Sequence, residues 1–297
     1  MKWDDLRVFL QVARMERLVV AGKSLGMDPA TVGRRVTALE DALGAKLFDR
    51  SPLGYDLTEA GRKLVDHAQN IESITGVAQE AIGGQSDALS GVVRIGAPDG
   101  VSNFLLTGAT AELSRDNPDL NIQIVALPRV FSLSQREADL TLTVSPPTAG
   151  RLKIRKVADY NLHVYAARSL LEKTGPIASR TDMREVPLIG YISDMIFDKE
   201  LDYLSIIGED RTPRLTSNSL IVQLRWCLAG FGLCILPDFV ADEYPDLVAI
   251  MPNDAHLTRA FYLVRHQDDD RIARVAKTAD VVAEYMKVKL AALPLPA

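Results

Sequence analysis

Apolar side chains recur at three- and four-residue steps through the first 44 residues, a spacing that predicts amphipathic helices. Asp4 or Asp5 stands where the first of them needs a cap. The stripe of this first helix consists of Leu6, Phe9, Leu10 and Ala13. A second short helix is expected around residues 18–25, where Gly26 ends it as a C-terminal glycine does.

The third helix starts with a strong signal, because Asp28 can cap it and Pro29 suits its first turn. Its expected buried stripe is Val32, Val36, Leu39 and Leu43. Thr31, Arg34 and Arg35 are left on another face. Since arginine matches phosphate oxygens and the guanine edge, this helix fits a DNA groove. By itself, the segment fits a solvated amphipathic helix equally well.

The surroundings of this helix favour a DNA-binding unit. A short helix, a turn of about three residues and a second helix form a helix-turn-helix. Two short strands, residues 46–50 and 55–57, flank the turn at residues 51–54 and predict a hairpin, or wing. Arg50 and Ser51 stand near its tip, within reach of a phosphate or a minor groove.

A long helix follows from Thr58, its expected cap. An apolar stripe with a seven-residue repeat runs along it, and such a stripe can face a second copy of the chain. Packing on its own domain is the alternative, but residues 1–57 offer no further apolar face to cover it. Dimerisation is therefore expected through Leu64, His67, Ile71, Ile74 and Ala78. Glycine and serine at 83–86 and 90–91 indicate a hinge.

From Val92 onward, strand patterns alternate with helix patterns, which predicts an α/β fold with a parallel sheet and crossover helices. The expected strands are residues 92–96, 121–125, 138–144 after a short helix, 162–166, 187–191, 233–236 and 260–264. The expected helices are 104–117, one from about 169, 218–229 and 270–290. Two lobes of this kind leave a cleft between them as the default ligand site.

Charge is unevenly distributed along the 297 residues, whose formal net charge is −5. Residues 1–65 hold eleven Lys and Arg against nine Asp and Glu, whereas the remainder carries −7, which fits a DNA contact confined to the front end. No stretch approaches the ~20 apolar residues of a membrane span. The first residues lack the form of a signal peptide, so a cytoplasmic protein is expected.

Few residues suggest catalysis. Cys227 and Cys234 flank a Gly-containing apolar run and are interpreted as core residues, so neither a metal nor a cofactor is expected. Four scattered histidines and the absence of G-x-S-x-G, P-loop and H-E-x-x-H motifs argue against an enzyme. A small-molecule binding module whose N-terminal helices serve only oligomerisation remains the alternative to a DNA-binding regulator.

These blocks resemble the LysR-type transcriptional regulators over the whole chain. The resemblance is strongest at residues 6–9, 21–25, 29–44, 47–50 and 57–61, and further blocks are 95–96, 117–120, 137–140 and 229–237. The chain departs from the family pattern around the third and second helices, at Asp28, Pro29, Ala30, Thr31 and Gly33, and at Arg17, Leu18, Val19 and Gly22. The resemblance implies an N-terminal winged helix-turn-helix, a linker helix and a two-lobed domain like periplasmic binding proteins. It also implies two or four subunits that bind double-stranded DNA and a small molecule between the lobes.

The resemblance assigns site residues as well. Those expected at DNA are Asp28, Ala30, Thr31, Arg34, Arg35, Arg50 and Ser51. Those expected at the effector are Pro98, Asp99, Gly100, Ser102, Asn103, Ser145, Thr216, Ser217 and Asn218. Helix starts favour anions, so a small carboxylate is the natural effector, although Asp99 is better explained as a helix cap.

The expected domains are 1–57 for DNA binding, 58–90 for the linker and 91–297 for the effector. Within the last, lobe I covers about 91–160 and 266–297, and lobe II about 161–265.

Overall fold

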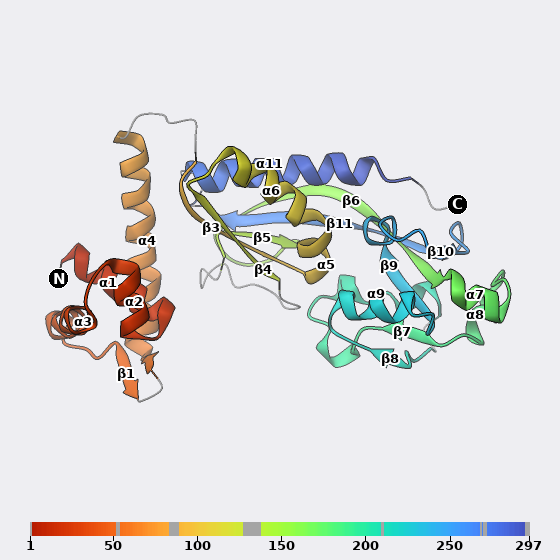
Figure 1. The fold of residues 1–297 in the computed structure, drawn as a ribbon, viewed down its shortest axis with the longest axis horizontal. Coiled ribbons are helices and arrows are strands. Elements are labelled where there is room, and N and C mark those ends of the chain that lie inside the picture. Colours follow the sequence, from red (N-terminus) through yellow and green to blue (C-terminus); the bar gives the residue numbers. More distant parts are fainter. Residues whose placement is uncertain are drawn as a thin grey trace. The chain divides into compact units, whose positions relative to one another are not determined.

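The structure, a computed structural model, describes residues 2–51, 54–82, 89–126, 138–208, 211–267, 269 and 272–294 (Figure 1). It separates into two compact units, Met1–Ser86 and Asp87–Ala297. None of the helices in these described ranges combines the length and the apolar composition needed to cross a bilayer.

Four helices and a hairpin make up the N-terminal unit. They are α1 (Trp3–Met15), α2 (Leu18–Leu25), α3 (Pro29–Leu43), β1 (Phe48–Ser51), β2 (Gly54–Leu57) and α4 (Glu59–Ile82). Val32, Val36 and Leu39 are buried as expected, whereas Leu43 is 40% exposed because it lies at the last turn of α3. The expectation that Asp4 or Asp5 caps α1 is wrong. Lys2 is the N-cap, and both aspartates lie in the first turn, where they suit the helix dipole.

The long helix α4 begins as expected, with the Thr58 Oγ1 accepting from the Gly61 amide at 3.0 Å. Its first turns pack on the N-terminal unit, since Ala68 is fully buried and Leu64 is half-buried against the same core. The premise that residues 1–57 leave this stripe uncovered is therefore wrong for its first part.

The second unit is built on one nine-stranded sheet in the order β4-β3-β5-β11-β6-β9-β7-β8, with β10 paired to β6. Its strands are β3 (Gly91–Ala97), β4 (Leu120–Ala126), β5 (Leu140–Thr143), β6 (Leu152–Ala167), β7 (Leu188–Gly190), β8 (Leu215–Thr216), β9 (Leu233–Pro237), β10 (Leu247–Ile250) and β11 (His256–His266). The expected parallel pairing holds only within each half, for β3 with β4 and β5 and for β7 with β8 and β9. The sheet is mixed, because β6 and β11 pair antiparallel through its middle.

These two strands are longer than expected. Residues 162–166 are only the end of the sixteen-residue β6, and 260–264 are the middle of β11. The start of β6 was not predicted as a strand, because charged side chains interrupt the apolar run there. The register shifts once, at Phe261/Tyr262.

Helices cover the sheet, and α11 (Ala273–Ala291) runs along the same face as α6 (Thr107–Asp116) (Figure 1). The helix expected at 104–117 begins earlier, as α5 (Asp99–Val101) and the π-helical turn η1 (Ser102–Leu106). The one expected at 218–229 is α9 (Leu220–Leu228), capped by Ser219. The remaining elements are α7 (Arg168–Thr174), α8 (Arg180–Arg184), α10 (Asp238–Ala241), η3 (Ser193–Met195), η4 (Lys199–Leu201) and η5 (Leu204–Ile206). The short helix expected before residue 138 lies outside the described residues.

Candidate functional site

A chain of hydrogen bonds organises the start of α3. The Asp28 carboxylate caps the helix by accepting from the Thr31 amide at 3.0 Å and also accepts from the Thr31 hydroxyl. Arg34 then donates from Nη2 to the Thr31 Oγ1 at 3.0 Å. The hydroxyl and amide of Thr31 hold the pKa of Asp28 below its usual value. Asp28, Ala30 and Arg34 are all exposed, so this turn presents a defined polar surface.

The two adjacent arginines of α3 occupy different environments. Arg34 is exposed, whereas Arg35 is half-buried and its Nη1 lies 3.6 Å from the Asp5 Oδ1 on α1. An ion pair with its own chain ties Arg35 to α1. Arg34 is therefore the better placed of the two for a partner.

Arg50 is held by the body of the unit. Its Nη2 donates to the Glu40 Oε2 at 2.9 Å and to the Thr37 Oγ1 at 3.1 Å, and its guanidinium carbon lies 5.5 Å from the ring centroid of Tyr55. The side chain is still 42% exposed, so part of the guanidinium faces solvent. Ser51 ends β1 and is exposed.

Glu40 is the residue of this unit that sequence reasoning missed. It is only 2% exposed, and its Oε1 accepts from the amides of Leu47 at 2.9 Å and Phe48 at 3.3 Å. Burial alone would raise the pKa of Glu40, but these amides and the nearby Lys46 and Arg50 hold it below its usual value. The available signal was its position four residues after the buried Val36.

The proposed dimerisation stripe has an exposed part. His67 and Ile71 are exposed on α4, and Ile71 keeps 36% of its surface accessible. Ile74 and Ala78 belong to α4 by backbone, but their side chains lie outside the described residues.

In the second unit, Pro98, Asp99 and Gly100 line a small cavity of about 30 Å³. The Asp99 Oδ1 accepts from the Gly100 amide at 2.9 Å, and its Oδ2 accepts from the Ser219 hydroxyl at 2.6 Å. Asp99 is thus the first residue of α5 rather than its cap, and it links α5 to the cap of α9.

Two of the expected effector residues serve the α5–η1 segment instead. The Ser102 hydroxyl is buried and donates to the Ala97 carbonyl at 3.3 Å. The Asn103 amide nitrogen donates to the Asp99 carbonyl at 2.7 Å. Neither residue lines the small cavity or the larger one beside it, because both side chains are committed to main-chain carbonyls.

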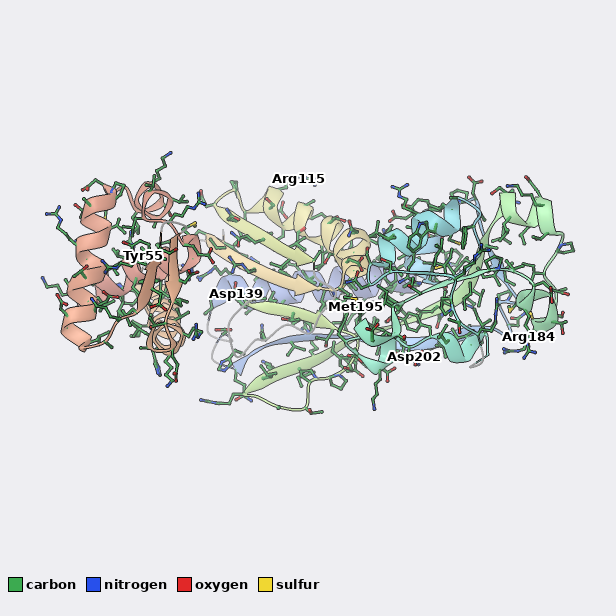
Figure 2. The ribbon with its side chains drawn as sticks, turned by 90° about the horizontal axis from the view of Figure 1, so that it is seen from below. Tyr55, Arg115, Asp139, Arg184, Met195 and Asp202 are labelled. Atoms are coloured by element: carbon green, nitrogen blue, oxygen red, sulfur yellow. The ribbon has the colours of Figure 1, made fainter. Side chains whose placement is uncertain are left out.

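The larger cavity has a volume of about 570 Å³ and lies between β7, β8, α9 and the segment that carries Met195 and Asp202 (Figure 2). Thr216 lines it. Ser217 instead supports the loop, with its hydroxyl accepting from the Ser219 amide at 3.1 Å and its carbonyl accepting from the Gln223 Nε2 at 2.9 Å. Asn218 is half-buried beside it.

Ser145 reaches across to the neighbouring segment, where its hydroxyl donates to the Asp198 carboxylate. Asp198 and Ser219 were not expected at the site. Both are 50 or more residues distant from their partners, and no local pattern marks such pairs.

The two cysteines and the buried Asp238 lie within the core of the second unit. Cys227 and Cys234 are buried thiols, and burial raises the pKa of Cys227 to about 12. Asp238 is buried and accepts from the Tyr165 hydroxyl at 2.8 Å, with the His163 Nδ1 at 2.7 Å. Across the described ranges, no group of three or more His, Cys, Asp or Glu is arranged to hold a metal ion.

Two models of known protein families match this chain, one for each of its two parts. The model "LysR substrate binding domain" matches residues 86–287, and "Bacterial regulatory helix-turn-helix protein, lysR family" matches residues 3–62. The HTH-type transcriptional regulator HdfR of Yersinia pestis (strain Pestoides F) is 28% identical over 282 residues, covering 93% of this chain and 94% of that protein.

Solved structures share the fold over nearly the full length. CrgA, a LysR-type transcriptional regulator from Neisseria meningitidis, has a TM-score of 0.60 at 22% identity, covering 96% of this chain and 99% of that one. A full-length OxyR variant from Pseudomonas aeruginosa has a TM-score of 0.70 at 19% identity, covering 95% and 94%. Full-length CbnR, solved in complex with its target DNA, has a TM-score of 0.59 at 17% identity, covering 95% and 100%.

Proposed function

The chain belongs to the LysR family of bacterial transcriptional regulators, and on this premise we propose which of its residues read DNA and sense the effector. The protein is a DNA-binding transcriptional regulator with an N-terminal helix-turn-helix and an effector-binding domain. The proposed division keeps 1–57 for DNA binding, 58–90 for the linker and 91–297 for the effector.

The proposed reading surface is the first half of α3. The observation that carries it is the Asp28–Thr31–Arg34 chain, which leaves the Arg34 guanidinium exposed and oriented. Ala30 provides a small neighbour, and Arg50 and Ser51 supply wing contacts to phosphates or a minor groove. Arg35 has a supporting role, because Asp5 already engages it.

Operator binding tests this assignment. Affinity for the promoter beside the protein's own gene is measured against salt for Arg34→Ala, Arg35→Ala and Arg115→Ala. Arg115 is a matched arginine on α6 of the other unit (Figure 2). A base contact by Arg34 costs about 1–3 kcal/mol and relaxes the sequence preference, whereas a phosphate contact lowers the salt slope by about one. Unchanged affinity, preference and slope in Arg34→Ala would contradict the assignment.

We propose further that a small-molecule effector binds in the second unit between the lobes, and that exposed positions on α4 pair two subunits. The effector contacts are Pro98, Asp99 and Gly100 at the small cavity and Thr216 at the larger one. No catalytic step is assigned, since the relatives named above are transcriptional regulators. With DNA as its target, the protein acts in the cytoplasm.

A further inference from the structure

The small cavity beside Asp99 is surrounded by aromatic rings. Tyr160, Tyr191, Tyr203, Phe239 and Phe261 line it together with Asp99. Tyr160 stacks on Phe261 with 4.0 Å between ring centroids, and Tyr191 meets Tyr203 edge to face at 6.0 Å. An aromatic face carries negative potential and a ring edge positive potential, so a ring that turns its face to the cavity favours a cation there.

Asp99 adds a full negative charge to this aromatic wall. Its carboxylate accepts from the Gly100 amide and the Ser219 hydroxyl, and no Lys, Arg or His of the described residues pairs with it. Asp99 and Tyr191 line the same cavity, and burial, followed by the charge of Asp99, raises the pKa of Tyr191. The carboxylate therefore lacks a cation that would neutralise it.

The charged residues around the small cavity do not neutralise the Asp99 carboxylate. Asp198 has the Ser145 hydroxyl and the Glu200 amide as partners, and among the described residues no cation pairs with it. Arg259 forms an ion pair with Glu200, with 2.7 Å between Nε and Oε2, so its charge is already neutralised by that carboxylate. Lys199, Asp202 and Arg211 line the larger cavity and not the small one. Among the described residues that line the small cavity, Asp99 is the one that carries a charge, and that charge is negative.

We propose that the effector is an organic cation, a primary ammonium group on an apolar body, with the ammonium held by Asp99 among these rings. This inference rests on the proposed effector site. A cavity of about 30 Å³ suits one water-sized group, which an ammonium is. The 570 Å³ cavity shares Tyr191, Leu201 and Tyr203 with it. Its wall also holds Ile189, Ile192 and Ile196, which offer apolar contacts for the body, beside the charged Lys199, Asp202 and Arg211. A cation is proposed here in place of the small carboxylate expected from the sequence, because the Asp99 carboxylate already lies at the start of α5.

Calorimetry on the full-length protein tests the proposal with three probes of one shape: 2-phenylethylamine, 3-phenylpropionate and 2-phenylethanol. We expect the amine to bind most tightly, by about 100-fold or more over the carboxylate, because an anion beside Asp99 is repelled in a site of low dielectric. Equal or tighter binding of the carboxylate or the alcohol, or no saturable binding of the amine, overturns the proposal.

Variants separate a ligand contact from a structural effect. Asp99→Asn keeps an acceptor for Ser219 and removes the charge, so amine affinity should fall about 10- to 100-fold. Ser219→Ala releases Asp99, so amine affinity should stay equal or rise, whereas a purely structural role predicts a fall in both variants. Asp159→Asn, an exposed aspartate paired with Lys156, is the matched control. Operator binding is measured on the wild-type chain and on every variant. If the wild-type chain does not bind the operator, the proposed function is wrong. If it binds the operator but not the amine, only this inference is wrong.

Discussion

Arg50 and Glu40 meet at 2.9 Å between Nη2 and Oε2, joining the first strand of the wing to the end of α3. The Glu40 side chain is buried, whereas the Arg50 side chain is 42% exposed, so Glu40 fixes the position of an arginine that still faces solvent. The same carboxylate accepts the amides of Leu47 and Phe48, where the chain enters the wing. One buried acidic group thus fixes the geometry between α3 and the wing.

Replacing Glu40 should unfold the wing. Glu40→Ala leaves two buried amides without an acceptor, and we expect the free energy of unfolding of the N-terminal unit to fall by about 2–4 kcal/mol. Chemical denaturation measures it. Glu59→Gln, in an exposed pair with Lys63, is the control and should cost below about 1 kcal/mol. Equal losses in the two variants would show that Glu40 has no special role.

Acid should weaken the same unit. The folded-state pKa of Glu40 is lower than its usual 4.5, so its contribution to stability is complete above that value. The contribution is lost as the pH falls through the lowered pKa, because the unfolded chain binds the proton first. Unfolding midpoints followed below pH 4.5 should decline less steeply in Glu40→Gln than in the wild-type chain. Parallel curves would assign the acid sensitivity to other carboxylates.

Two glycines of the helix-turn-helix should respond in opposite ways to alanine. A Cβ on Gly22 would lie 2.6 Å from the Met27 carbonyl oxygen, so Gly22→Ala should destabilise by about 1–3 kcal/mol. At Gly33 the nearest atom is the Leu18 Cδ1 at 3.3 Å, and alanine favours the helix by up to about 1 kcal/mol. Thermal unfolding should rank Gly33→Ala at or above the wild type and Gly22→Ala below it. The reverse order would contradict the close approach at Met27.

The exposed part of the α4 stripe should control assembly. Ile71→Asp places a charge where a second subunit is proposed, and we expect light scattering to report a smaller particle at equal concentration. Lys63→Asp, on the same helix but outside the stripe, should leave the mass unchanged. An unchanged mass for Ile71→Asp would move the subunit contact elsewhere.

Local signals predicted the N-terminal unit well. Asp28 and Gly26 are cap residues, and the alternation around a Pro/Gly turn marks the hairpin, so each element is encoded within a few residues of itself. The buried role of Glu40 was hidden, because its partners follow six to ten residues later in another element.

The second unit was less predictable. Its strands were found in most cases, and the parallel pairs within each half agree with the prediction. The antiparallel pairing of β6 with β11 was not predicted, since the paired residues lie about a hundred positions apart in the sequence. The Asp99–Ser219 contact, on which the proposal of a cationic ligand draws, spans 120 positions. A pattern of neighbouring residues carries no information about such pairs.

The ribbon of β6 and β11 contains one register shift, next to the stacked rings of Tyr160 and Phe261. Phe261 pairs with Ala158 and Tyr262 with Lys156, so Val157 is the extra residue on β6. Lys156 and Ala158, which flank it, pair with two successive residues of β11 and therefore face opposite sides of the ribbon, as neighbours in a regular strand do. Removing Val157 would join them without turning over either half of β6. A chain that lacks Val157 should therefore keep Tyr160 in the aromatic wall and lose only the local bend that the extra residue gives the strand.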